Sequence, residues 1–214
     1  WIEDKNVDFA YQIPEVRQKI ENVKKYRIGK QAYTNFNPED KPYQFLRMKM
    51  AKKRGLFIPT VSSGKRKYLT IGIFDNNAVI IDPNFAIYDC DLYIFGILSS
   101  LMHMVWMRAY TGRLKTDYRY SATLVYNTFP FPKISDQQKK RIELCVQEIL
   151  RVREKYSERT MAELYDPDKM PKDLSEAHHS LDMVIESCYR RKPFENDEQR
   201  LAHLFKMYEM MTNN

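Results

Sequence analysis

The spacing of apolar residues predicts helices at both ends of the chain. From Pro14 to Tyr26 apolar residues recur at helical intervals, and Gly29 follows as a stop. After Pro132 the same period predicts helices at 135–156, at 174–189 and from Asn196 onward. Ser135 and Gln138 have the spacing of a capping box, which strengthens the first of these three predictions.

The most apolar segment lies between these regions, from Asp91 to Tyr110, and its period predicts one continuous core helix that ends at Gly112. His103 falls inside it without a second metal ligand nearby, so a packed histidine is expected. His178 and His179 lie on a predicted helix and are expected at a helix cap or in a surface hydrogen bond.

Short β-rich runs predict strands before the apolar helix. Leu56–Ser62 and Tyr68–Phe74 are expected to form a hairpin around 63–67, with Gly64 available for a positive φ. Pro59 favours an edge position for the first strand. Two more strands are expected at 78–81 and 86–88, and residues 31–54 are expected to form a long connecting loop.

These elements predict an α+β fold in two domains. Residues 1–132 are expected to hold a mixed or antiparallel sheet, and residues 133–214 a small helical domain. The chain lacks a long apolar run and a signal-peptide pattern, which predicts a cytoplasmic protein without a membrane partner. A start at Trp1 suggests a piece of a longer polypeptide, and the three cysteines are expected to be reduced thiols.

The net positive charge is confined to the first predicted domain. Residues 1–132 carry 20 Lys and Arg against 12 Asp and Glu, whereas residues 133–214 carry 15 against 16. The segment 41–74 contains no acidic residue and nine cationic ones: Lys41, Arg47, Lys49, Lys52, Lys53, Arg54, Lys65, Arg66 and Lys67. Such a one-signed surface attracts a phosphate backbone, and a membrane fits less well because no basic amphipathic helix carries these charges.

The stretch from Gly112 to Pro132 interleaves Arg113, Lys115 and Arg119 with five aromatic residues. Cations that pair with phosphates or guanine edges, next to rings that can stack on bases, suit nucleic acid. A buried aromatic strand with a solvated rim is the alternative. The charge distribution favours nucleic acid.

Catalytic and cofactor motifs are not evident in these residues. The six glycines form neither a GxGxxG motif nor a phosphate loop, and the histidines and cysteines lack zinc spacing. The chain itself is therefore expected to bind and not to catalyse.

Three blocks carry a resemblance to a known family: VSSGKRKYLTIGIF (61–74), FGILSSLMHMVWMR (95–108) and GRLKTDYRYSATLVYNTFPFP (112–132). Together with the run from Met161 they resemble the target-recognition and closing helical segments of MmeI-like (type IIL) restriction-modification proteins and their adenine-methyltransferase relatives. The resemblance implies binding of double-stranded DNA. It also implies an upstream domain that binds S-adenosylmethionine and methylates adenine at N6, with endonuclease activity in some members.

The resemblance implies base readout by the stretch that follows Val61-Ser62-Ser63, which places Gly64, Lys65, Arg66 and Lys67 at the bases. The family usually has an acidic residue where this chain has Gly64, so a cytosine amino group would lack an acceptor there. Arg66 is the favoured reader of guanine, and a phosphate clamp is its alternative role. The other candidates are assigned to the DNA backbone: Lys49, Lys52, Lys53, Arg54, Arg113, Lys115, Tyr118 and Arg119.

The sequence therefore predicts a sequence-specific DNA-recognition module of a larger prokaryotic adenine methyltransferase. Two alternatives stay open: a module for structured RNA, and a helical protein-interaction scaffold whose basic charge is incidental.

Overall fold

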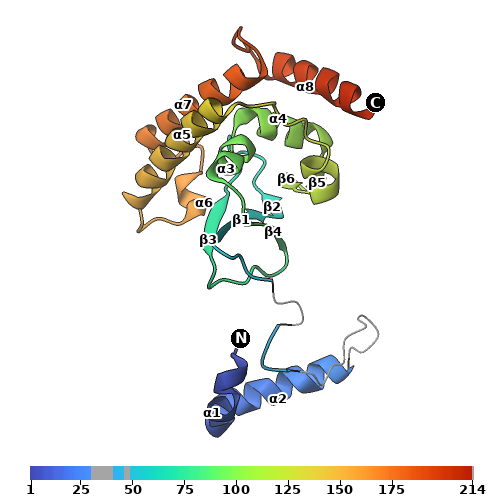
Figure 1. Ribbon diagram of the computed structural model, residues 1–214, viewed down its shortest axis with the longest axis vertical. Helices are drawn as coiled ribbons and strands as arrows, with labels where there is room; N and C mark the ends of the chain where they lie inside the picture. The colour runs from blue at the N-terminus through green and yellow to red at the C-terminus, as the bar shows by residue number, and fades with distance from the viewer. Residues whose placement is uncertain (30–40, 46–48, 214) are drawn as a thin grey trace. The chain divides into compact units, whose positions relative to one another are not determined.

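The computed structural model describes residues 1–29, 41–45 and 49–213, and for residues 113 and 114 only the backbone (Figure 1). The chain divides into two compact units, Trp1–Met50 and Ala51–Asn214. Most of the predicted connecting loop at 31–54 lies outside the described residues.

The first unit is helical. A 3-10 turn at Asp4–Asn6 leads into α1 (Val7–Gln12), and α2 (Pro14–Gly29) follows and confirms the predicted helix. A returning segment lies against the start of the chain, since the Ile2 amide donates to the Tyr43 carbonyl at 2.9 Å. Asp4 accepts hydrogen bonds from Lys41 at 2.6 Å and from Tyr43 at 3.0 Å.

The second unit contains two small antiparallel sheets. One has the order β3 (Gly72–Asp75), β1 (Arg54–Pro59), β4 (Asn84–Tyr88), and the other has the order β2 (Val61–Ser62), β6 (Asp117–Arg119), β5 (Gly112–Leu114). The chain leaves the first sheet after Pro59 and joins the second one at Val61. The α+β class with antiparallel sheets is confirmed.

The predicted hairpin around 63–67 is wrong in its pairing. β1 does pair with β3, but β2 pairs with β6, and residues 68–71 form no strand. Tyr68, Leu69 and Ile71 are each at most 1% exposed. Because all of these side chains are buried, the segment lacks the alternation of a half-exposed strand.

Two further strand predictions need correction. β1 is the central strand of its sheet and not an edge, and Pro59 is tolerated because it is the last residue of that strand, opposite Asn84. The strand at 86–88 is confirmed within β4, whereas residues 78–81 form no strand.

The predicted helix from Asp91 to Tyr110 is two helices, α3 (Leu92–Leu98) and α4 (Leu101–Tyr110), which meet at 55°. The break follows from two serines, because the Ser99 and Ser100 hydroxyls donate to the Phe95 and Ile97 carbonyls at 2.8 and 2.7 Å. Gly112 is not the stop, since the helix ends at Tyr110 with Thr111 as its C-cap, and Gly112 begins β5. Within the described part of the chain, no single helix is long and apolar enough to cross a membrane.

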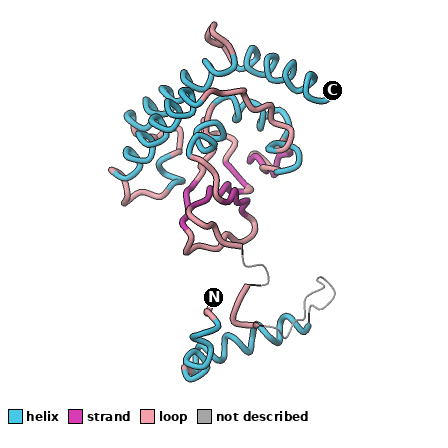
Figure 2. Tube along the Cα trace, viewed as in Figure 1, coloured by secondary structure: helices cyan, strands magenta, loops and turns pink. Residues whose placement is uncertain are grey.

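The C-terminal helices agree with the sequence. They are α5 (Asp136–Glu154), α7 (Lys172–Tyr189) and α8 (Asp197–Thr212), with an unpredicted short helix, α6 (Met161–Leu164), between the first two. The capping box of Ser135 and Gln138 is present, as predicted. Figure 2 shows the strands of this unit gathered apart from the long helices α5, α7 and α8.

A single hydrophobic core runs from the strands into these helices. Leu56, Phe95, Trp106, Ile142 and Leu181 are all at most 1% exposed and belong to one buried cluster. The predicted division at 132/133 therefore passes through a compact unit with a shared core. The division of the chain into domains at this point stays a prediction, and the packing is continuous across it.

Candidate nucleic-acid interface

The structure brings the predicted base-reading loop and the basic hairpin together. Residues 63–67 follow β2, whose Val61 and Ser62 pair with Arg119 and Tyr118 of β6. The β5–β6 hairpin turns at Lys115 and Thr116, so its tip lies beside the loop. Segments about 50 residues apart in sequence thus form one basic surface, which we call the loop–hairpin surface: residues 63–67 and 112–119.

Gly64 is required here for close approach and not for a positive φ, which no described glycine adopts. A Cβ on Gly64 would lie 2.2 Å from the carbonyl oxygen of Thr116. The Gly64 amide also faces Asp117 Oδ1 at 3.4 Å. With this backbone, the loop has no room for the acidic residue that the family resemblance leads one to expect.

The loop presents its cations to different degrees. Lys65 and Lys67 are exposed, and Arg66 is half-buried. The Arg66 amide donates to the Ser63 carbonyl at 3.1 Å, which closes a tight turn. The Lys67 ammonium lies 5.3 Å from the centre of the Tyr68 ring. Arg66 therefore comes from the most constrained part of the loop.

The hairpin adds further cations to the loop–hairpin surface. Lys115 is exposed at the turn with φ 59°, and Arg119 is exposed on β6. The backbone of Arg113 lies in β5 opposite Tyr118. Tyr118 itself is only 7% exposed, so its ring supports the loop from below and offers little surface to a ligand.

Two further aromatic residues of this stretch are buried, whereas Tyr126 and Phe131 are half-buried. Tyr120 and Phe129 are 2% and 1% exposed. His103 explains part of this packing, because its ring lies 4.6 Å from Phe129 and its Nε2 lies 3.0 Å from the Tyr120 hydroxyl. Burial lowers the pKa of His103 to about 3, which confirms a packed, neutral histidine.

A second basic group lies at the opposite end of β1. The Lys52 and Lys53 amides donate to Asp89 Oδ1 at 2.6 and 3.1 Å, and the Asp89 amide returns a bond to the Arg54 carbonyl. Asp89 thus fixes this backbone while the side chains of Lys52, Lys53 and Arg54 stay exposed. Lys49 belongs to the first compact unit and is not placed relative to the others.

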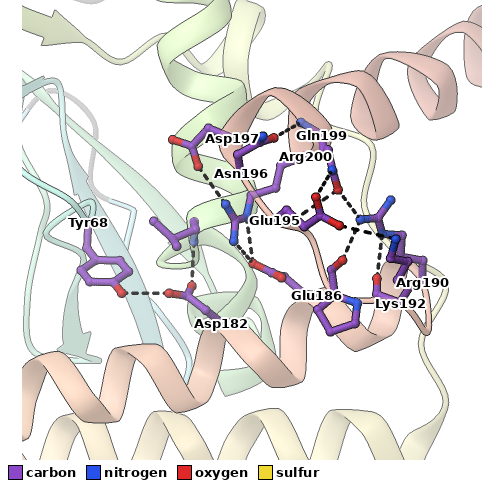
Figure 3. Close-up of polar contacts among 12 residues, drawn as sticks. Tyr68, Asp182, Glu186, Arg190, Lys192, Glu195, Asn196, Asp197, Gln199 and Arg200 are labelled. Carbon is purple, nitrogen blue, oxygen red and sulfur yellow. Dashed lines mark hydrogen bonds and ion pairs between the residues drawn. The ribbon is translucent and has the colours of Figure 1, made fainter.

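Tyr68 directly follows the loop 63–67 and is buried beside Asp182 (Figure 3). Tyr68 donates to Asp182 Oδ2 at 2.8 Å, and the Leu101 amide donates to Asp182 Oδ1 at 2.8 Å. Burial raises the pKa of Asp182 to about 7, despite these two bonds, which favour the ionised form. Asp182 lies one helical turn after His178, and nothing in the local sequence indicates that a tyrosine 114 residues earlier is its partner.

The prediction for His178 is wrong. It is fully buried, its Nε2 lies 2.7 Å from the Tyr165 hydroxyl, and its ring stacks on Tyr68 with centroids 4.2 Å apart. Burial holds its pKa well below the usual value. Polar residues on a helix are ordinarily solvated, and only the packing of α7 against α5 and the 68–71 segment places this one inside. Across the described residues, no group of three or more His, Cys, Asp or Glu could hold a metal ion.

Comparison with known proteins identifies the class. Residues 1–133 match the family model of the MmeI target recognition domain, and residues 134–214 match that of the MmeI C-terminal domain. The chain belongs to the MmeI target-recognition and C-terminal domain family, and the predicted resemblance is confirmed.

The chain is also similar to two individual proteins. Over 171 residues the chain is 45% identical to DNA methyltransferase A of Bacillus subtilis (strain 168), covering 80% of this chain and 19% of the relative. It is also similar to the solved structure of the type IIL restriction-modification enzyme MmeI in complex with DNA, with a TM-score of 0.86 and 35% identity. That match covers 100% of this chain and 29% of the other, so the chain spans less than a third of either relative.

Proposed function

We propose that this chain is the sequence-specific, double-stranded-DNA recognition module of a larger adenine-N6 methyltransferase. The observation that carries the proposal is the loop–hairpin surface, where Lys65, Arg66 and Lys67 lie beside Lys115 and Arg119 in a member of a target-recognition family. Such a surface offers point charges for phosphates and one guanidinium fork for a guanine edge.

Affinity and sequence choice would come from different residues. We assign base readout to the loop 64–67, with Arg66 as the main reader of guanine N7 and O6. We assign phosphate contact to Lys115, Arg119 and the group Lys52, Lys53 and Arg54. Phosphate contacts hold the duplex without reading it, and a bidentate base contact discriminates by about 1 to 3 kcal/mol.

The spacing of the two basic groups suits a duplex. Arg54 and Pro59 bound β1, and at about 3.3 Å per residue its two ends lie about 17 Å apart. Phosphates of one strand recur about every 3.4 Å along the helix axis, so a span of this length parallel to the axis covers about five base pairs. A single DNA molecule could therefore engage both.

The parent protein would complete the reaction. In it, an upstream domain would bind S-adenosylmethionine and methylate an adenine flipped out of the stack, while this module holds the duplex in register. The bacterial relative supports a prokaryotic, cytoplasmic protein. Fused endonuclease activity forms no part of the proposal.

The test uses the full-length protein and its own target, found by mapping methylated adenines in a genome with and without the gene. We expect Lys52→Ala to weaken binding to cognate and scrambled duplexes alike, and Arg66→Ala to relax preference at one base position. An equal loss on both duplexes for Arg66→Ala would assign Arg66 to phosphate and contradict its role as a reader.

Structured RNA is one of two rival functions, and the burial of three aromatic rings argues against it. Tyr118, Tyr120 and Phe129, which the sequence offered as stacking platforms, are at most 7% exposed. Competition between duplex DNA and a hairpin RNA decides the matter. Preference for RNA would overturn the proposal, and an interaction scaffold would show no salt-dependent affinity for either.

A further inference from the structure

The base-reading loop is tied to the C-terminal helices through one guanidinium. Arg108 of α4 directs Nη2 to the carbonyl oxygen of Arg66 at 3.4 Å and Nη1 to Asp197 Oδ2 at 3.2 Å. Asp197 is the first residue of α8. The Arg108 side chain thus joins the backbone of the proposed base reader to a helix more than 120 residues further along the chain.

Asp197 is itself held in place from behind. Its Oδ1 accepts from Arg200 Nη1 at 3.0 Å, and Arg200 pairs with Glu186 of α7 through Nη2 at 2.7 Å and Nε at 2.8 Å. The side chains of Arg200 and Glu186 are only 14% and 7% exposed. Figure 3 shows Asp197, Arg200 and Glu186 in one chain of contacts. A carboxylate anchored in this way is a fixed support for Arg108.

A second tether lies two residues further along the loop. The Tyr68 hydroxyl donates to Asp182 of α7, and Asp182 also accepts from the Leu101 amide at the start of α4. Arg66 is therefore held at its carbonyl and Tyr68 at its hydroxyl, both by the helical region. Lys65 and Lys67 extend from this fixed backbone into solvent.

We propose that Arg108 and Asp197 are positioning residues for base choice: they fix the backbone of Arg66 so that its side chain meets one base in a single geometry. This inference rests on the proposed function and adds residues outside the loop to the determinants of specificity. Bidentate readout needs a guanidinium held in register with the base edge, and a base contact made from a mobile backbone distinguishes bases less well.

An alternative is that Arg108 contacts phosphate directly and contributes only affinity. The two roles predict different effects of Asp197→Asn on discrimination between bases. Removal of a negative charge beside a DNA-binding surface strengthens binding to any duplex when Arg108 is a phosphate contact. If Asp197 positions Arg108 and the loop, the same change lowers discrimination between bases even where overall affinity rises.

Glu148 of α5 provides a matched control. Its pairing with Arg151 involves a side chain that is 48% exposed, against 47% for Asp197, and neither residue of that pair is bonded to the loop. Glu148→Gln and Asp197→Asn therefore make the same chemical change at equal exposure. Arg108→Lys keeps the charge and removes the fork that spans two acceptors.

The experiment uses the full-length protein and a pool of duplexes with randomised positions, from which the bound fraction is sequenced. The duplex ranked highest and its variant at the position relaxed by Arg66→Ala are then titrated individually. We expect Asp197→Asn and Arg108→Lys each to reduce discrimination at that position by about 3- to 10-fold. The double variant should lose no more than the larger single loss, and Glu148→Gln should retain the wild-type ratio.

Wild-type discrimination in Asp197→Asn would overturn the inference, and so would an equal loss in Glu148→Gln. Failure of the proposed function looks different. In that case the wild-type protein selects no base at any position, or Arg66→Ala leaves every preference unchanged. A relaxed position in Arg66→Ala together with an unchanged Asp197→Asn refutes the positioning role alone.

Discussion

The helical core and the loop–hairpin surface each contain a glycine that has no room for a side chain, Gly96 and Gly64. A Cβ at Gly96 of α3 would lie 2.4 Å from Ile142 Cγ2, 3.1 Å from Val146 Cγ2 and 3.3 Å from Leu181 Cδ1, all apolar side-chain atoms. A Cβ at Gly64 would lie 2.2 Å from a backbone carbonyl oxygen, that of Thr116. Both sites exclude a side chain, but the neighbours that exclude it differ.

The difference lies in what each region can adjust. Around Gly96 the neighbours are side-chain methyl groups, so small shifts and repacking of side chains on α5 and α7 relieve part of a clash. Around Gly64, the neighbour is the backbone of a short hairpin, so the strands themselves must move. Damage to the core should therefore appear as lost stability, and damage to the loop–hairpin surface as altered recognition.

The largest effect is expected in the core. Trp106 is fully buried and lies against Tyr110, Phe129, Phe205 and Tyr208. Trp106→Ala should lower the free energy of unfolding by about 3 to 5 kcal/mol through lost contacts and a cavity. Chemical denaturation measures this, with Leu144→Ala, at a position 65% exposed, as a nearly neutral control. Base preference of the folded fraction should be unchanged. A changed preference would contradict the expectation that damage to the core affects only stability.

Asp182 predicts a pH dependence of stability. Its pKa is raised in the folded state from 3.8 to about 7, so the folded state binds the proton more tightly than the unfolded state. Stability from this group is complete below about pH 4 and is lost as the pH rises through 7, by an amount of the order of 4 kcal/mol. Denaturation of wild type and Asp182→Asn between pH 4 and 8 checks this. Parallel curves for the two proteins would exclude a raised pKa.

Gly64→Ala should lower stability by about 1 to 3 kcal/mol, because the hairpin must move away from the new methyl group. It should also shift base preference, since Arg66 follows two residues later. Gly29→Ala, outside the loop–hairpin surface and with nothing within 4 Å of the new Cβ, is the control and should alter neither property by much. Denaturation and sequencing of a bound duplex pool measure both. If stability fell and base preference did not change, the position of the hairpin would have no part in base readout.

The smallest effect is expected for Lys52→Ala. Lys52 is exposed and its amide, which binds Asp89, is retained, so stability should change by less than about 0.5 kcal/mol. The slope of log affinity against log salt concentration should fall by about one, for cognate and scrambled DNA alike. Titration at several salt concentrations tests this, and an unchanged slope would remove Lys52 from the interface.

The sequence by itself determined the local elements and the chemistry of the surface. The capping box at Ser135 and the apolar period of α5, α7 and α8 are set by residues within a few positions of one another, so they could be predicted from spacing. The uneven charge of the chain likewise required no structure. The helix from 91 to 110 was predicted as one piece because Ser99 and Ser100 are compatible with a continuous helix until their hydroxyls compete for its carbonyls.

Only the tertiary structure decided which distant segments meet. The switch of the chain from one sheet to the other at Thr60 places the loop 63–67 beside the hairpin, and no local pattern encodes that pairing. His178 was expected at a helix cap or in a surface hydrogen bond, and only packing buries it, together with Asp182, against Tyr68. Burial, long-range pairing and the contact of Arg108 with Asp197 depend on the whole fold, because each joins residues that are far apart in sequence.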